Sequence, residues 1–352
     1  MNDLVEIFTA KKEYDSWLTD EYGRQRLFSN PSVPVFEPVV SRKLFESGLE
    51  PVYPEKKKFA FCLSHDIDLL YQHLSMKQRI KNTINPAYLR SAEMRKYHLR
   101  SLLSPRQHPH YSLDRLSDIN EKWGIRSTYF FLSLQTGERD FNYNIRDIRD
   151  QIRRLQALGN EIGLHGGHEA YNNLDKVLAE KRLLESEAGI TCSGYRNHYL
   201  RFDTQCSWQI LGKAGFTYDS TFAFADSVGF RNGMCYPFYP YDVRNQRFLP
   251  IIELPLIVMD ATFFYYMRLD IGMIRKIMKD LLQKVSAIGG VFTLLWHNNN
   301  LHGAYEKLYN ELLEMVLSYD PWVSTTDGLV SWWKTSGLLD KQQKLIKECF
   351  RL

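Results

Sequence analysis

The chain has 352 residues, of which 44% are hydrophobic and 24% charged, the composition of an ordinary globular protein. Its formal net charge of +4 is small for this length, so charge gives no support for nucleic-acid binding. Because no run of about 18 apolar residues occurs and the first residues carry no signal-peptide pattern, we expect a soluble protein without a transmembrane helix.

The cysteines are odd in number, and no two of them form a Cys-x-x-Cys pair. This pattern indicates a reduced, cytoplasmic chain rather than a disulfide framework or a thiolate metal site. Any metal is then expected on histidine and carboxylate side chains. The cysteines are Cys62, Cys192, Cys206, Cys235 and Cys349.

The first part of the chain divides into three segments. Residues 1–57 are mixed in character and contain several prolines, which predicts an N-terminal extension packed on a main domain at 58–335. Lys58–Ser64 is a short apolar run that predicts the first buried strand. Residues 70–112 form a basic insert, which we interpret as a solvated, partly helical excursion, with an anionic membrane surface or polymer as the alternative partner. Its basic residues are Lys77, Arg79, Lys81, Arg90, Arg95, Lys96, Arg100 and Arg106.

From residue 113 onward, helical and strand patterns alternate, and residues 336–352 are expected to form a C-terminal helix. Strands that alternate with helices of 10 to 15 residues favour an α/β fold with a parallel sheet or barrel. The expected helices are Leu113–Trp123, Ile145–Leu158, Leu174–Ala188 and Cys206–Ala214. The expected strands are Arg126–Leu132, Glu161–Leu164, Ile251–Pro255 and Gly290–Trp296.

Three of the expected strands run into ionisable residues. The first continues into Ser64-His65-Asp66-Ile67-Asp68, the second into His165-Gly-Gly-His168, and a late strand into His297. In barrel-type α/β folds, functional groups gather at the carboxyl ends of the strands. Three such endings in one chain are hard to ascribe to packing.

These residue types suit metal-assisted hydrolysis. Asp66 and Asp68, two apart on an extended chain, point to the same side and repel unless a cation or a shared proton separates their roles. His165 and His168 are joined by two glycines and could bind zinc with a carboxylate, whereas His297 carries an imidazole, a group that ordinarily titrates near neutral pH and suits a general acid. The alternatives are a turn with two surface aspartates, a glycine-rich turn, and a structural histidine.

Taken together, these motifs resemble those of the NodB-homology polysaccharide deacetylases, carbohydrate esterase family 4, over about residues 58–300. Ser64–Asp68 is similar to the first family motif, and this resemblance implies that Asp66 is the general base and Asp68 a metal ligand. His165-Gly-Gly-His168 resembles the family's pair of metal-binding histidines but is one residue shorter. The resemblance implies His165 as a ligand and leaves His168 or His198 as the third.

Further motifs follow in the family's order. Arg196, in the segment Gly194–Arg201, resembles the arginine that orients the base, although the usual proline is missing. Tyr218-Asp219-Ser220-Thr221 resembles the family's YDST segment, and Leu294-Leu295-Trp296-His297 its last motif, in which His297 is the general acid. The implied fold is an incomplete (β/α)7 barrel with an N-terminal extension and a helical insert.

The resemblance implies a metal-dependent hydrolase, most naturally with Zn²⁺, that removes N-acetyl or O-acyl groups from a carbohydrate in bacterial surface polysaccharide metabolism. Trp296, Tyr195 and Asp219 are expected to bind substrate, with Tyr199 as a further candidate for a sugar-stacking ring. The expected partners are a carbohydrate substrate and polysaccharide-synthesis proteins, with neither nucleic acid nor an integral membrane segment. The alternatives are an amidase acting on a small non-sugar amide, and an inactive sugar-binding or assembly protein of the same fold.

Overall fold

The computed structural model describes residues 2–14, 18–27, 33–70, 76–84, 99, 102 and 112–352. Its strands are β1 (Ala60–Ile67), β2 (Thr128–Leu132), β3 (Glu161–Gly166), β4 (Gly194–Asn197), β5 (Tyr218–Asp219), β6 (Tyr241–Asp242), β7 (Arg247–Phe248), β8 (Ile252–Glu253), β9 (Val258–Met259), β10 (Val291–Leu295) and β11 (Trp322–Val323). Its α-helices are α1 (Asn2–Phe8), α2 (Val39–Glu46), α3 (Met76–Thr83), α6 (Leu113–Lys122), α7 (Arg149–Ala157), α8 (Leu174–Ala188), α9 (Ser207–Lys213), α10 (Ile271–Ala287), α11 (Gly303–Leu317), α12 (Thr326–Thr335) and α13 (Leu338–Phe350).

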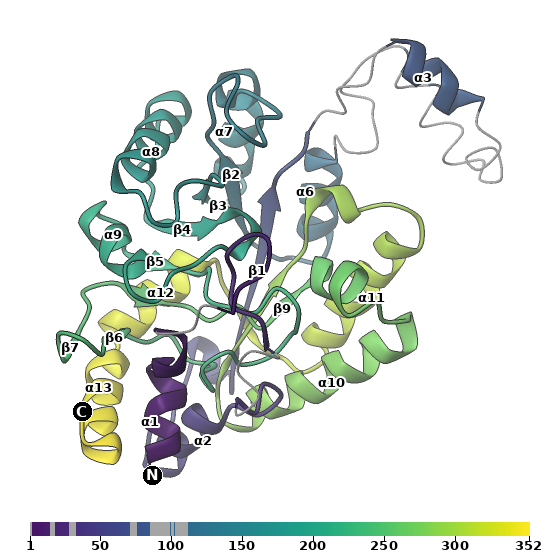
Figure 1. The fold of residues 1–352 in the computed structure, drawn as a ribbon. Coiled ribbons are helices and arrows are strands. Elements are labelled where there is room, and N and C mark those ends of the chain that lie inside the picture. The colour runs from purple at the N-terminus through teal and green to yellow at the C-terminus, as the bar shows by residue number, and fades with distance from the viewer. Residues whose placement is uncertain are drawn as a thin grey trace.

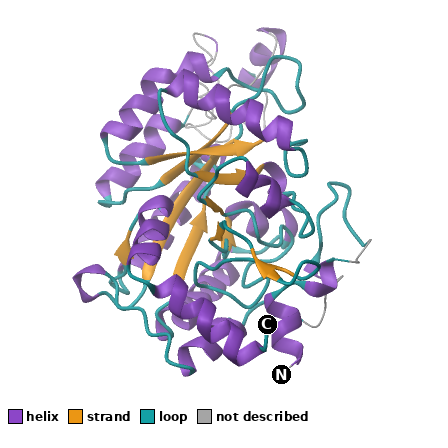
Figure 2. Cartoon of the chain, turned by 90° about the vertical axis from the view of Figure 1, so that its left-hand side faces the viewer, coloured by secondary structure: helices purple, strands orange, loops and turns teal. Residues whose placement is uncertain are grey.

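Within the described residues, the main sheet is parallel and runs in the order β8-β5-β4-β3-β2-β1-β10-β9, with β11 beside the start of β1. A single short segment supplies both edge strands, because β8 pairs with β5 whereas β9, a few residues later, pairs with β10. This segment links the two ends of the curled sheet, and helices cover the outside (Figures 1 and 2). The architecture is the incomplete (β/α)7 barrel that the sequence predicts.

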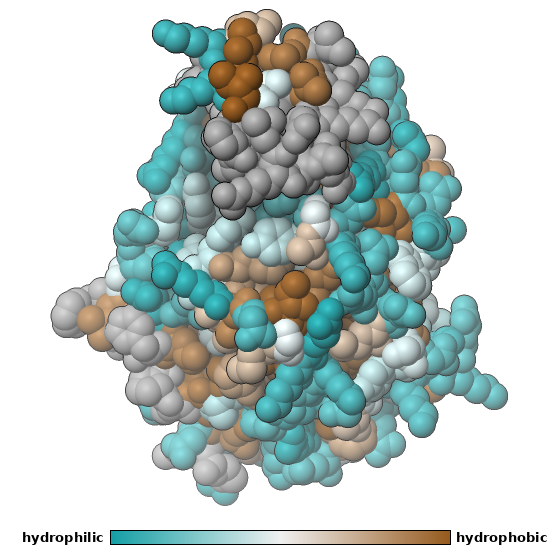
Figure 3. Space-filling view, turned by 90° about the vertical axis from the view of Figure 1, so that its right-hand side faces the viewer, coloured by the Kyte–Doolittle hydropathy of each residue, from teal (hydrophilic) through white to brown (hydrophobic). Residues whose placement is uncertain are grey.

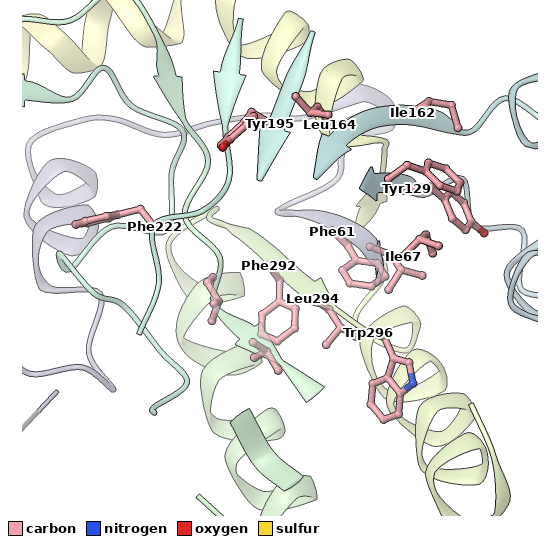
Figure 4. Packing of buried hydrophobic residues seen from close by; sticks show 14 of the residues in the cluster. Phe61, Ile67, Tyr129, Ile162, Leu164, Tyr195, Phe222, Phe292, Leu294 and Trp296 are labelled. Carbon is pink, nitrogen blue, oxygen red and sulfur yellow. The ribbon is translucent and has the colours of Figure 1, made fainter. Parts of the chain in front are cut away.

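Alternation along the strands separates an inner from an outer face. On β1, Ala60 and Cys62 belong to a core cluster inside the sheet, whereas Phe61, Leu63 and Ile67 belong to the larger cluster beneath the helices. Successive side chains of a strand point to opposite faces, so Ser64 and Asp66 share the inner face with Ala60. Figure 4 shows the outer cluster, in which the rings of Phe61 and Phe292 face each other with centroids 6.4 Å apart.

Most of the expected elements are present, with shifted ends. The first strand extends to Ile67, so the His-Asp motif lies on the strand itself rather than in a turn after it. The helix expected at 145–158 consists of a 3₁₀ turn (Ile145–Ile148) followed by α7. The sequence missed β5, β9 and β11 as strands, because each has only two residues and shows no periodicity.

The two ends of the chain pack together on the barrel. α1, α2 and α13 lie side by side (Figure 1), and the rings of Phe8 and Phe350 lie 6.0 Å apart. Glu13 forms a buried ion pair of 2.6 Å with Arg231, which ties the N-terminal segment to the barrel. The domain boundaries at 57/58 and 335/336 remain predictions.

Of the basic insert at 70–112, the structure describes Leu70, α3 with Ile84, Leu99, Leu102 and Ser112, and the rest of this prediction lies outside the described residues. The hydrophobic residues Met76, Ile80 and Ile84 are 58%, 50% and 66% exposed. Hydrophobic atoms are accordingly visible at the top of the face seen in Figure 3, where α3 lies. Among the described residues, no helix is both long and apolar enough to cross a membrane.

Candidate functional site

The strands carry the candidate residues to one rim of the barrel. Asp66 is near the end of β1, His165 is near the end of β3, and Arg196 is on β4. β1 pairs with β2, β2 with β3 and β3 with β4, and His165 lies opposite Arg196 in the last of these pairs. His297 follows β10, which pairs with β1 on its other side. Because all these strands are parallel, residues far apart in sequence meet at the carboxyl edge of the sheet.

Asp68, His165 and His198 form a cluster in which one ligand atom from each lies within 4.8 Å of the others. His165 Nε2 lies 3.1 Å from Asp68 Oδ1 and 3.1 Å from His198 Nδ1. His198 Nδ1 lies 3.4 Å from Asp68 Oδ1. Ligands held about 2.0–2.1 Å from a tetrahedral zinc ion are about 3.3–3.4 Å apart, so these separations suit one shared ion.

The hydrogen bonds and charges around the cluster also suit a cation. His165 Nδ1 lies 3.0 Å from the carbonyl oxygen of Arg196, and donating its proton there leaves the Nε2 lone pair facing the cluster. Asp68 Oδ1 is buried and has no hydrogen-bond partner among the described residues. Burial by itself would raise the pKa of Asp68, but His198, His165 and His297 lower it well below its ordinary value. Two imidazoles and an ionised carboxylate are a donor set that fits Zn²⁺.

Asp66 is held by Arg196 beside this cluster. Arg196 Nη1 donates to Asp66 Oδ1 at 3.0 Å and to Ser64 Oγ at 2.8 Å, and the guanidinium lies over the Phe130 ring. The other oxygen, Asp66 Oδ2, lies 3.8 Å from His165 Nε2, on the side of the cluster. Arg196 therefore fixes one carboxylate oxygen and leaves the second on the side of the cluster.

His297 forms a pair with Asp260, a residue that the sequence analysis missed. The Nδ1 atom of His297 lies 2.6 Å from Asp260 Oδ1, and the His297 backbone N–H donates to Asp260 Oδ2 at 2.9 Å. Burial by itself would lower the pKa of His297, but Asp260 and, to a smaller extent, Asp68 and Asp66 raise it to about 10. Asp260 follows β9, and an acidic residue directly after a recognised strand would have been the signal.

His168 lies outside the three-residue cluster. Its Nδ1 atom is 3.9 Å from Asp140 Oδ2, and this same oxygen lies 3.7 Å from His198 Nε2. Asp140, another residue that the sequence analysis missed, adopts a left-handed backbone with φ of 66° in the loop after β2. Of the two residues predicted as alternatives for the third ligand, the geometry groups His198, and not His168, with Asp68 and His165.

A pocket of about 280 Å³ opens over the cluster. The half-buried ring of Tyr199 and the exposed rings of Tyr265 and Tyr266 line it, together with apolar side chains and a buried arginine from the N-terminal segment, Arg24. The full lining is Arg24, Asp66, Asp68, His165, His198, Tyr199, Leu200, Met259, Ala261, Tyr265, Tyr266, His297, Asn299 and Asn300.

Three residues expected to bind substrate are instead buried, and this expectation needs correction. Trp296 and Tyr195 are 0% and 1% exposed, and both belong to the outer cluster beneath the helices. Asp219 is also fully buried; its Oδ1 accepts from Thr221, while burial raises its pKa to about 6 beside Glu253. Side chains alternate along a strand, so where Arg196 points inward its neighbour Tyr195 points away from the pocket.

No family model and no curated protein matches the sequence. Among solved structures, a provisionally assigned polysaccharide deacetylase from Mycobacterium smegmatis aligns with a TM-score of 0.55 and 17% identity, covering 82% of this chain and 94% of that one. A chitin deacetylase from the fungal pathogen Colletotrichum lindemuthianum aligns with a TM-score of 0.40 and 13% identity, covering 78% and 87%. A CE4 family pseudoenzyme from Bacillus anthracis aligns with a TM-score of 0.40 and 11% identity, covering 79% and 66%. Only the first of these scores is high enough to bear on the fold. Together with the curled parallel sheet and its helices, it shows that this chain has the fold of a polysaccharide deacetylase, an incomplete (β/α)7 barrel.

Proposed function

We propose that the protein is a metal-dependent hydrolase that removes N-acetyl or O-acyl groups from a carbohydrate. The observation that carries this proposal is the convergence of a carboxylate paired with arginine, a His-His-Asp cluster and a histidine paired with aspartate around one pocket. Hydrolysis of an acyl group needs a base for water, positive charge at the carbonyl oxygen and an acid for the departing group.

Asp68, His165 and His198 would hold the metal. A divalent cation at these residues would supply positive charge that polarises the attacking water and the acyl carbonyl. Arg196 hydrogen-bonds one carboxylate oxygen of Asp66. The other carboxylate oxygen accepts a proton from the water molecule while the water oxygen forms a bond to the carbonyl carbon.

His297 completes the reaction. Since its pKa is raised to about 10, the imidazole carries a proton at neutral pH and can donate it as the bond between the carbonyl carbon and the sugar nitrogen or oxygen breaks. Asp260 holds the ring by its Nδ1, so Nε2 is the atom that faces Asp68, at 3.6 Å, and the pocket. Acetate and the free amine or hydroxyl of the sugar are the products.

The aromatic lining supports a sugar as the substrate. Tyr265 and Tyr266 are 55% and 38% exposed at the pocket, and Tyr199 is half-buried there. Tyrosine offers an apolar face and a polar tip, a combination that suits a pyranose ring. The specific carbohydrate, a place in bacterial surface polysaccharide metabolism and a cytoplasmic location stay predictions from the sequence.

The test is to measure bound metal together with acetate release from N-acetylated oligosaccharides. We expect about one zinc ion per chain and acetate release that Asp66→Asn abolishes while the zinc content stays unchanged. His297→Ala should also keep the metal and slow the reaction. A protein that binds zinc and hydrolyses small amides but not acetylated sugars would be an amidase rather than a carbohydrate deacetylase. A protein that binds sugar but no metal would contradict the proposal that it is a hydrolase.

A further inference from the structure

The backbone that follows His198 is strained. Tyr199 and Leu200 have φ values of 60° and 55°, so two successive residues with side chains occupy the left-handed region. Such conformations cost free energy and persist only where surrounding contacts hold them. The position of the His198 side chain depends on this turn, because His198 is the first residue of the same short element, the 3₁₀ turn His198–Leu200.

The N-terminal segment contributes contacts to this turn. Thr19 and Gln25 pair as an antiparallel bridge, and the hairpin between them closes at Gly23, whose N–H donates to the carbonyl of Asp20. Asp20 also accepts from the backbone N–H of Arg24 at 3.0 Å and from Arg24 Nε at 2.7 Å. The hairpin, residues 18–27, therefore presents Arg24 in a fixed orientation.

Arg24 and Tyr22 of the hairpin meet the strained turn directly. Arg24 Nη1 donates to the carbonyl oxygen of Tyr199 at 2.8 Å, and the rings of Tyr22 and Tyr199 stack with centroids 4.6 Å apart and planes at 19°. In return, Arg201 Nε donates to the carbonyl oxygen of Tyr22 at 2.7 Å. The Tyr199 ring in turn lies 4.0 Å from that of His198.

Arg24 also contacts the aromatic lining of the pocket at Tyr266. Its Nη2 atom lies 3.1 Å from the hydroxyl of Tyr266, and its side chain is only 5% exposed. One buried guanidinium thus joins the turn after His198, the hairpin and the aromatic wall.

We propose that Arg24, which the hairpin 18–27 presents to the turn after His198, is a positioning residue that holds His198 as a zinc ligand. This inference rests on the proposed function, since it assumes that Asp68, His165 and His198 bind a cation. Without Arg24 the turn at Tyr199 and Leu200 can relax, and His198 then has to be reordered each time the metal binds. Loss of such an outer support typically lowers metal affinity 10- to 100-fold.

The experiment compares Arg24→Ala with Arg26→Ala in the full-length chain. Arg26 lies on the same hairpin, and its side chain is 46% exposed beside Asp226, so the control removes an equal charge. Zinc affinity is measured by competition with a chromophoric chelator, on protein whose folded state is checked by circular dichroism. We expect Arg24→Ala to bind zinc about 10- to 100-fold more weakly and Arg26→Ala to bind like the wild type.

A second variant and a second measurement cover the case in which Arg24→Ala does not fold. Tyr22→Leu removes only the stacked ring and should also weaken zinc binding, by a smaller factor. Because coupling is reciprocal, zinc should slow hydrogen exchange at residues 22–24 of the wild type. Equal zinc affinity in the wild type and in a folded Arg24 or Tyr22 variant would overturn this inference and leave the proposed function intact, whereas a wild type that binds no zinc would overturn both.

Discussion

The pairing of His297 with Asp260 makes the strongest prediction about the chemistry. Asp260→Asn keeps the size of the side chain and removes its charge, which, after burial, is the largest influence on the pKa of His297. Since Asp260 raises that pKa and burial lowers it, the variant should return the pKa from about 10 toward or below the ordinary value of 6.5.

The size of the effect follows from the two pKa values. At pH 8 the imidazole of the wild type is almost fully protonated, whereas with a pKa of about 6.5 only about 3% of it would carry the proton. The proton-donating form would fall about thirty-fold, so the alkaline limb of the activity profile should move down toward neutral pH. NMR titration of His297 in the metal-free protein measures the pKa directly, and an alkaline pH profile of acetate release measures its consequence.

The same pair should affect stability with a definite sign. The folded-state pKa of His297 lies above the unfolded value, so its contribution is complete below about pH 6.5 and is lost as the pH rises toward 10. The difference in free energy of unfolding between the wild type and Asp260→Asn should therefore shrink over that range. A His297 pKa that does not move in Asp260→Asn would refute the reasoning.

Two further predictions concern the metal and the fold. His198→Ala should abolish zinc binding, whereas His168→Ala should retain most of it; the reverse result, by elemental analysis, would restore His168 as the third ligand. Glu13→Ala should lower the free energy of unfolding by about 3–5 kcal/mol in urea titration, because it leaves the buried charge of Arg231 unpaired. Adding Arg231→Met to Glu13→Ala should recover part of this loss, and a single variant as stable as the wild type would contradict the argument.

The fold and the inner residues were predictable because they follow from local patterns. Apolar runs that end in Asp66, His165 and His297 predict parallel strands with functional groups at one rim, and the structure has this arrangement. The same reasoning failed for Trp296 and Tyr195. A motif match does not specify which face of the sheet a side chain occupies, and both of these side chains point toward the helices.

The side-chain contacts around the site could not be predicted from the sequence, for a different reason. Asp260 follows a strand of two residues, too short to show periodicity, and its distance in sequence from His297 carries no local signal. Asp140 and Arg24 lie in segments without a recognisable motif. Their contacts with residues near the ligands exist only once the chain has folded.

The shortened histidine motif links these observations. His168, separated from His165 by two glycines, lies outside the cluster and near Asp140. Under the proposed function, the third ligand is His198, which directly follows β4 and begins a strained turn. A ligand from such a turn needs support that a histidine on regular structure does not, and the N-terminal hairpin supplies contacts of this kind. Under the proposed function, the third ligand therefore lies in the loop after β4, and the N-terminal hairpin contacts this loop next to that ligand.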